Sequence, residues 1–112
     1  MIELQITRPP SANRLWRRSG SRIHKSREYT AWLVEAGWQV RQLAKGARIG
    51  GKYSLTYFAG RSSKVHPDLD NFAKPINDLL KSVGVIRDDK DCEEIHGFWA
   101  VGEGVLVRVQ PA

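Results

Sequence analysis

Residues 66–89 read HPDLDNFAKPINDLLKSVGVIRDD, and the fold is organised around the helix that this stretch predicts. Its apolar residues recur at helical spacing, as one face of an amphipathic helix requires. Those residues are Phe72, Ile76, Leu79, Leu80 and Val83. Pro75 has no N–H and is tolerated only in a first turn. The regular helix is therefore expected to begin after Asp70, or to have a first turn distorted around Lys74 and Pro75, and to end at Gly84.

The segments on either side of this helix predict an α+β domain. Before it, residues 11–25 form a basic loop, and Ser26 caps a helix that runs to about Lys45. The expected strands, which alternate apolar and polar residues, are residues 2–6, 52–59, 95–101 and 105–109. A Gly-Glu-Gly hairpin turn at residues 102–104 joins the last two. This order predicts a small mixed sheet of about four strands with two main helices.

Length and composition restrict the class of protein. A chain of 112 residues suits one domain, residues 1–112, and is too short for two hydrophobic cores. The hydrophobic share of 41% argues against disorder. No stretch approaches the roughly 20 apolar residues of a membrane span, so no membrane partner is expected. The opening MIELQITRPP lacks the apolar segment of a secretory signal, and Cys92 is the only cysteine, which favours a reducing, cytoplasmic location.

The net charge of +6 is distributed unevenly along the chain. Residues 1–64 contain 13 Lys and Arg against 3 Asp and Glu, whereas residues 65–112 contain 5 against 9. A basic half favours a polyanionic partner, with nucleic acid as the leading candidate. An acidic half repels phosphate. A function that consists only of coating DNA therefore does not explain why the second half of the chain is acidic.

The acidic residues gather on both sides of the predicted helix, and they suggest a metal site. In extended backbone, residues i and i+2 point the same way, so Asp68 and Asp70 present two carboxylates to one point. Together with the acidic pair Asp88 and Asp89, they would form a Mg²⁺ or Mn²⁺ site, because these ions prefer hard oxygen ligands. Two alternatives remain open: Asp68 or Asp70 caps the helix, and residues 88–89 form a solvated turn.

Lys74 and Asn71 each have two interpretations. Lys74 follows Asp70 by four residues, so the two share a helix face. They form either a surface ion pair worth about 0.3–0.5 kcal/mol or a site in which the ammonium stabilises charge on a scissile phosphate. Asn71 either bonds a metal-bound water or caps the helix, and capping is favoured.

These motifs resemble the RusA family of Holliday junction resolvases, which are small phage-type endodeoxyribonucleases. The resemblance is carried by HPDLDNFAKPINDLL followed by VIRDD, and PPSANRLWR at residues 9–17 is similar to the family's opening. It extends from about residue 7 to about residue 95. The resemblance implies an α+β fold, a homodimer, and cleavage of branched DNA at four-way junctions with Mg²⁺ (or Mn²⁺).

The match of motifs also implies roles for individual residues. Asp68, Asp70 and Asp89 would be the catalytic, metal-binding carboxylates, and Lys74 would be the catalytic lysine. The further candidates for the metal or its surroundings are Asp88 and Asn71.

The residues expected to bind DNA come mainly from the basic half. They are Arg14, Arg17, Arg18, Arg22, Lys25, Arg27, Arg61, Lys64 and His66. His66 stands where family members often carry Arg or Lys, so its contact would depend on protonation. Residues 91–94 are more acidic than the family pattern. Trp16 either stacks on a base or packs against the protein.

The resulting prediction is a Mg²⁺-dependent endodeoxyribonuclease that resolves four-way (Holliday) junctions by paired phosphodiester hydrolysis, in DNA recombination and repair. Three alternatives remain. The first is a non-catalytic DNA-binding protein, and the second is a nuclease of broader specificity that acts on flaps or forks. The third is a protein-interaction module that docks through its acidic loop.

Overall fold

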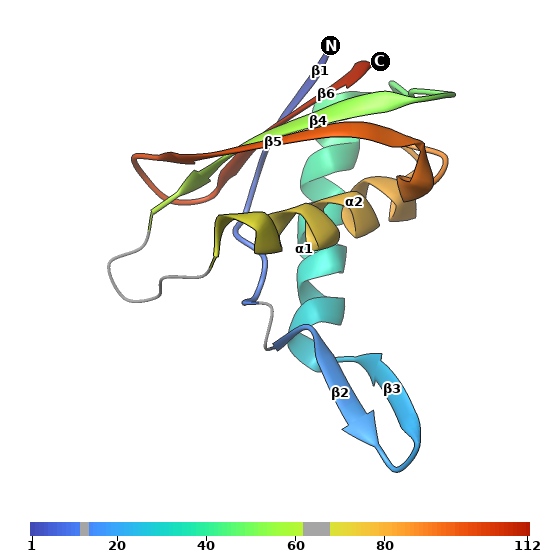
Figure 1. The fold of residues 1–112 in the computed structure, drawn as a ribbon, viewed down its shortest axis with the longest axis vertical. Coiled ribbons are helices and arrows are strands. Elements are labelled where there is room, and N and C mark those ends of the chain that lie inside the picture. The colour runs from blue at the N-terminus through green and yellow to red at the C-terminus, as the bar shows by residue number, and fades with distance from the viewer. Residues whose placement is uncertain (12–13, 62–67) are drawn as a thin grey trace.

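The computed structural model describes residues 1–11, 14–61 and 68–112, which form a mixed four-stranded sheet with two helices against one face (Figure 1). The elements are β1 (Ile2–Ile6), β2 (Trp16–Ser19), β3 (Arg22–Lys25), α1 (Arg27–Ala44), β4 (Tyr53–Gly60), α2 (Ala73–Ser82), β5 (Cys92–Ala100) and β6 (Val105–Pro111). Short 3₁₀ helices, η2 (Leu69–Phe72) and η3 (Asp89–Asp91), flank α2. The predicted α+β class is confirmed, with its small mixed sheet and two main helices.

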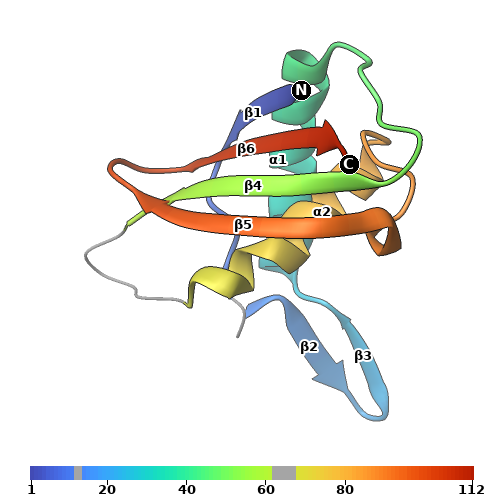
Figure 2. The same cartoon turned by 45° about the horizontal axis from the view of Figure 1, so that its top comes forward.

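The sheet has the strand order β1-β6-β4-β5, and Figure 2 shows β4 between β6 and β5. β4 is parallel to β5 and antiparallel to β6. Parallel neighbours need a crossover connection, and α2 supplies it. Alternate residues of β4 point toward the helices, so Leu55, Tyr57 and Ala59 are at most 1% exposed and form the centre of the core.

Helix α1 follows the sequence prediction closely. The Ser26 hydroxyl accepts a hydrogen bond from the Tyr29 backbone N–H at 3.0 Å, which confirms Ser26 as the N-cap. The helix ends at Ala44, because Lys45 takes the left-handed conformation with φ of 52°. Its apolar stripe, which includes Trp32 and Val40, packs into the core.

Residues 16–25 form a β-hairpin, so the prediction of a basic loop over residues 11–25 is wrong for this part. β2 and β3 pair antiparallel from Trp16↔Lys25 to Ser19↔Arg22. Gly20, with φ of 63°, supplies the positive φ that a tight two-residue turn needs. All eight strand residues are exposed, which explains why no apolar alternation marked them as strands. The hairpin projects away from the sheet beside the start of α1 (Figure 1).

The predicted hairpin at residues 102–104 is also wrong. β5 and β6 lie on opposite sides of β4, so their connection passes across the end of that strand (Figure 2). Gly60 lies beneath this connection and donates its N–H to the Gly104 carbonyl at 2.9 Å. A Cβ at Gly60 would come within 2.3 Å of the Gly102 carbonyl oxygen, so the crossing requires glycine there. A Gly-Glu-Gly segment between two alternating strands serves a hairpin and such a crossing equally well.

The predicted irregular start of the second helix is confirmed. η2 occupies Leu69–Phe72, and α2 begins at Ala73, so Pro75 is the third helical residue, where its missing N–H leaves no bond unmade. Val83 ends α2, and Gly84 follows with φ of 80°. Within the described ranges, no helix has both the length and the hydropathy that crossing a membrane requires.

Candidate active site

Asp68 and Asp70 stand at the start of the segment that leads into α2. Asp68 has extended backbone, but Asp70 lies within η2, so the premise that both sit in one extended segment is wrong. Both residues are exposed. Asp68 occupies the N-cap position of η2 without a side-chain capping bond, so its carboxylate remains available for another partner.

Asn71 and Phe72 show that no side chain caps α2. Phe72 occupies the N-cap position of α2 and makes no side-chain capping bond. Asn71 lies inside η2, so the favoured prediction that it caps the helix is wrong. Its backbone N–H donates to the Asp68 carbonyl at 3.1 Å.

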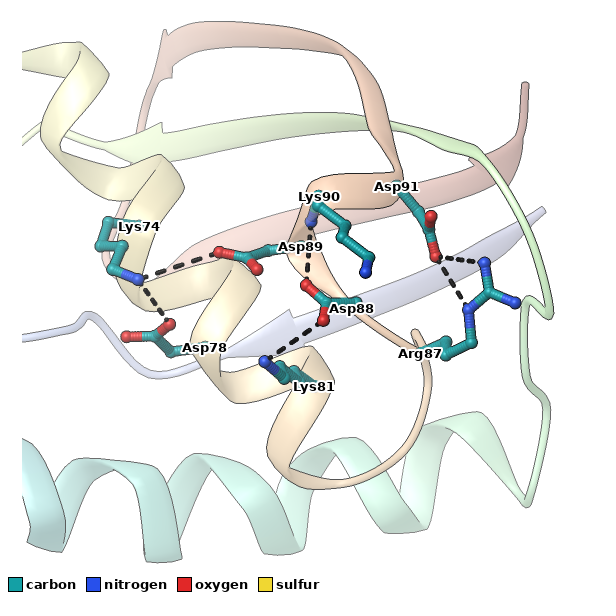
Figure 3. A network of polar contacts seen from close by, with 8 residues as sticks. All are labelled: Lys74, Asp78, Lys81, Arg87, Asp88, Asp89, Lys90 and Asp91. Atoms are coloured by element: carbon teal, nitrogen blue, oxygen red, sulfur yellow. Dashed lines mark hydrogen bonds and ion pairs between the residues drawn. The ribbon is translucent and has the colours of Figure 1, made fainter.

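Asp88 and Asp91 have structural partners at the second acidic segment. The Asp88 carboxylate accepts the Lys90 backbone N–H at 3.1 Å and thereby caps η3. This hydrogen bond, with help from Lys81, lowers the pKa of Asp88. Asp91 is buried and accepts two hydrogen bonds from Arg87, at 3.0 and 3.1 Å (Figure 3).

Lys74 and Asp89 are the predicted catalytic residues that the fold brings together. The Lys74 ammonium lies 3.1 Å from Asp78 Oδ1 and 3.8 Å from Asp89 Oδ2. Figure 3 shows it between the two carboxylates, one on α2 and the other at the start of η3. Among the described residues, the ion pairs of Lys74 are with these two aspartates, and the alternative pair with Asp70 is not formed.

The carboxylates suit a hard divalent cation by their chemistry. In the part of the chain that the structure describes, no three His, Cys, Asp or Glu side chains are grouped closely enough to hold one. Asp70 lies near the buried hydroxyl of Tyr57, whose pKa is raised first by burial and then by the Asp70 charge. That hydroxyl donates to the Leu69 carbonyl at 2.6 Å and so fixes η2 on the sheet.

Sequence reasoning missed Arg8, which ties the acidic segment to the sheet. Its Nη1 donates to the Gly60 carbonyl at 2.5 Å, and its guanidinium lies 5.3 Å from the Phe72 ring centroid. Arg8 thus contacts the end of β4 and the end of η2, on either side of the connection between them. Its buried Nη2 has no hydrogen-bond partner among residues 1–11, 14–61 and 68–112. An arginine before a Pro-Pro pair gives no sequence signal of this role.

Most of the predicted DNA-binding residues lie on or beside the β2–β3 hairpin. The exposed ones on the hairpin are Arg17, Arg18, Arg22 and Lys25. Arg14 precedes it, 3.7 Å from Glu28, and Arg27 is the first residue of α1. A groove of about 850 Å³ lies between hairpin and helix, and Arg17, His24, Lys25 and Arg27 contribute to its wall.

The remaining DNA-binding candidates separate into two groups. Lys64 and His66 lie outside the described residues. Arg61 is exposed just past β4, with its guanidinium 5.1 Å from the Trp99 ring centroid. Trp16 packs edge-on against Tyr29 with ring centroids 5.9 Å apart, yet it remains 41% exposed, so part of its ring stays accessible.

Comparison with known proteins identifies relatives along most of the chain. The family model described as Endodeoxyribonuclease RusA matches residues 7–110. A protein of Aquifex aeolicus (strain VF5) named crossover junction endodeoxyribonuclease RusA is 29% identical over an alignment of 115 residues, gaps included. The alignment covers 98% of this chain and 91% of that protein. A protein of the same name from Enterobacteria phage HK97 is 29% identical over 87 residues, covering 78% of this chain and 72% of the relative. The chain therefore belongs to the endodeoxyribonuclease RusA family.

Proposed function

We propose that residues 1–112 act as one endonuclease domain that resolves four-way DNA junctions by paired, metal-dependent phosphodiester hydrolysis in recombination and repair. The observation that carries this proposal is the Lys74 ammonium next to Asp89, on the helix that the exposed residues Asp68 and Asp70 lead into. Membership of the RusA family and the names of both relatives support the same reaction. A cytoplasmic location would give the protein access to its DNA.

Asp68, Asp70 and Asp89 would hold the divalent cation, Mg²⁺ or Mn²⁺. When bound, such an ion activates water and neutralises charge on a phosphodiester. Asp88 and Asn71 adjoin these ligands in the sequence and would surround the ion, while Asp88 also keeps η3 in place.

Lys74 would stabilise the negative charge that develops on the phosphate or on the leaving oxygen. Its side chain is 57% exposed, so a phosphate can reach it. The 3.8 Å separation from Asp89 is longer than the roughly 2.8 Å of a strong charge-assisted hydrogen bond. The ammonium can therefore exchange this contact for a phosphate oxygen with little loss.

The basic residues of the amino-terminal half would bind the DNA backbone. Arg14, Arg17, Arg18, Arg22, Lys25 and Arg27 lie on or beside the hairpin, and Arg61, Lys64 and His66 are further candidates, closer to the acidic residues in the sequence. Since each phosphate contact releases counterions, binding should weaken steeply with salt. The partly exposed ring of Trp16 gives a surface on which an unpaired base can stack.

A homodimer would place two such sites on one junction. A four-way junction has two-fold symmetry, and a symmetric dimer can cut two opposed strands. Exposed apolar side chains, including Trp38 on α1 and Phe98 on β5, provide surface that a second copy can cover. Light scattering at working concentration should give the mass of a dimer, and a monomer mass would count against this part of the proposal.

A junction-cleavage assay tests the proposed reaction. Purified protein is incubated with a synthetic four-way junction or matching linear duplex, in Mg²⁺, Mn²⁺ or EDTA. We expect cleavage of the junction alone, with divalent ion alone. Equal cutting of linear duplex would contradict junction specificity, and cutting in EDTA would contradict metal dependence.

The Asp70→Asn variant tests the metal site in the same assay. Its cleavage rate should fall at least about 100-fold, because loss of a metal ligand should cost more activity than loss of a residue that only hydrogen-bonds to a ligand. Junction binding should persist, and Glu35→Gln, on the exposed side of α1, serves as the matched control. Full activity of Asp70→Asn would refute the assignment of this ligand.

A further inference from the structure

Lys74 is the end of a chain of polar contacts that begins in the core. The Tyr29 hydroxyl, on α1, donates to Asp78 Oδ2 at 2.5 Å. The other oxygen of the same carboxylate accepts a hydrogen bond from Lys74 Nζ at 3.1 Å. The two oxygens of Asp78 therefore have different partners, one from α1 and one from its own helix.

Tyr29, the first residue in this series of contacts, is held rigidly. Tyr29 is fully buried, and its ring stacks on Trp32 and meets the edge of Trp16, with centroids 6.1 and 5.9 Å away. Burial raises the pKa of Tyr29, and the neighbouring Asp78 raises it further, so the hydroxyl stays protonated and continues to donate. The carboxylate it contacts is thus oriented by the packing of one helix on the other.

Lys74 differs in this respect from Lys81, the next lysine along the same helix. Lys81 lies 3.7 Å from Asp88, and both of these residues are on or near the surface. Among the described residues, no buried side chain forms a hydrogen bond with Lys81 or Asp88. A surface pair of this kind holds its lysine weakly, because the gain in attraction barely exceeds the lost side-chain entropy. Asp78, only 17% exposed, ties Lys74 to the core instead.

The Lys74 ammonium is held between two carboxylates at unequal distances. Asp78 lies closer to the Lys74 ammonium than Asp89 does, at 3.1 Å against 3.8 Å. Figure 3 shows the ammonium between these two carboxylates. Asp78 therefore limits the positions of the ammonium to those next to Asp89. A free lysine side chain has four rotatable bonds and spends much of its time elsewhere.

We propose that Tyr29 and Asp78 are positioning residues that hold the Lys74 ammonium at the reacting phosphate. This inference rests on the catalytic role of Lys74 in the function proposed above. Neither Tyr29 nor Asp78 needs to touch DNA or metal. Their effect passes through Lys74 alone, and that restriction makes the proposal testable.

A double-mutant cycle measures whether Asp78 acts through Lys74. Single-turnover cleavage of the junction in saturating Mg²⁺ is compared for wild type, Asp78→Asn, Lys74→Ala and the double variant. Asp78→Asn should slow cleavage about 10- to 100-fold, as the loss of a residue that orients a reacting group does, with junction affinity changed less than about twofold. In the Lys74→Ala background, Asp78→Asn should have no further effect.

Tyr29→Phe tests the first link without altering any charge. It should slow cleavage by about three- to tenfold, a smaller loss because Asp78 still contacts Lys74. Tyr53→Phe is the matched control, since it removes a buried hydroxyl that bonds a different residue of α2, Asn77, at 2.6 Å. That control should leave the cleavage rate unchanged within twofold.

The outcomes separate this inference from the function on which it rests. If Lys74→Ala cleaves normally, the catalytic role of Lys74 fails, and the positioning role fails with it. If Lys74→Ala is slowed but Asp78→Asn cleaves normally, or if Asp78→Asn loses the same factor in both backgrounds, the positioning inference alone is overturned.

Lysine-ammonium NMR gives a readout that does not depend on cleavage. In Tyr29→Phe the Lys74 Nζ resonance should shift or broaden, while those of Lys81 and Lys90 stay unchanged. An unchanged Lys74 resonance in both Tyr29→Phe and Asp78→Asn would overturn the proposal, whatever the cleavage rates are.

Discussion

The β2–β3 hairpin and the Lys74 site are built on opposite principles. All eight strand residues of the hairpin are exposed, and an isolated two-stranded hairpin is only marginally stable in water. The residues around Lys74 are instead attached to α2, whose other face is buried, with Ile76 and Leu79 fully covered. Binding a phosphate backbone needs charge and tolerates movement, whereas phosphoryl transfer needs groups held in place. Under the proposed function, the hairpin would therefore contribute affinity for DNA, and the Lys74 site would contribute the cleavage rate.

The two regions meet at Tyr29. Its ring contacts Trp16 of the hairpin, and its hydroxyl contacts Asp78 beside Lys74. Away from this shared residue, variants confined to one region should change one property, affinity or rate, and leave the other nearly unaffected. The predictions below test that separation.

The largest effect is expected for Asp89→Asn. The substitution keeps the shape of the side chain but removes the charge that faces Lys74 and would bind the cation, so cleavage should fall at least about 100-fold. Asp88→Asn, one residue earlier, should lose much less activity, because Asp88 would adjoin the ion without binding it and its carboxylate caps η3. Junction cleavage and gel-shift affinity measured on both variants check this, and equal losses would show that the two carboxylates are not distinct.

Gly60→Ala should destabilise the fold that supports the acidic site. The added Cβ would meet the Gly102 carbonyl oxygen at 2.3 Å, and backbone cannot move aside cheaply. A loss of about 1–3 kcal/mol in the free energy of unfolding is expected from such overpacking. Gly50→Ala is the control, since a Cβ there meets nothing within 4 Å. Urea unfolding measures both variants, and an unaffected Gly60→Ala would contradict the tight crossing of β4.

Arg22→Ala should affect binding and spare the rate. Removing one phosphate contact should weaken junction affinity and lower the slope of log affinity against log salt by about one. The cleavage rate at saturating protein and the melting temperature should stay at wild-type values, because Arg22 is exposed on the hairpin. Arg48→Ala, exposed elsewhere on the basic half, is the control. A lower saturated rate would show that the hairpin also positions DNA for cleavage.

The smallest effect is the pH dependence that comes from Asp88. Its pKa is lowered in the folded protein, chiefly by the Lys90 backbone N–H, so the ionised form favours folding. This stabilisation is present above the ordinary aspartate pKa and is lost as pH falls through the lowered value. Asp88→Asn should thus melt slightly below wild type at pH 7, and the gap should close at low pH. Circular dichroism melts across acidic pH follow the gap, and a constant gap would argue against the charge.

Local patterns predicted the elements of this fold better than their arrangement. Helical spacing and Ser26 located α1 to within one residue at its end, and Pro75 announced the irregular turn before α2. The hairpin over residues 16–25 was missed because neither face of it is buried. Its strands therefore show no alternation of apolar and polar residues. The connection at residues 102–104 was read as a hairpin because the insertion of β4 between β5 and β6 is a long-range pairing.

The candidate site divides in the same way. The sequence already suggested an acidic site next to Lys74, from the spacing of DLDN, the lysine and the later pair of aspartates. The partners of Lys74 were not predictable, because Tyr29 lies 49 residues from Asp78 and reaches it only through the packing of α1 on α2. Arg8 was missed for the same reason, since Gly60 is 52 residues away.

By itself, the sequence determined the types of most elements, the basic and acidic halves of the chain, and the candidate residues for the chemistry. These depend on local spacing and side-chain type. Only the tertiary structure decided that Asp88 caps a turn, that Asp89 faces Lys74, and that Asp78 contacts both Tyr29 and Lys74. Those distinctions depend on contacts between distant segments, and such contacts follow from how the helices and strands bury their apolar faces together.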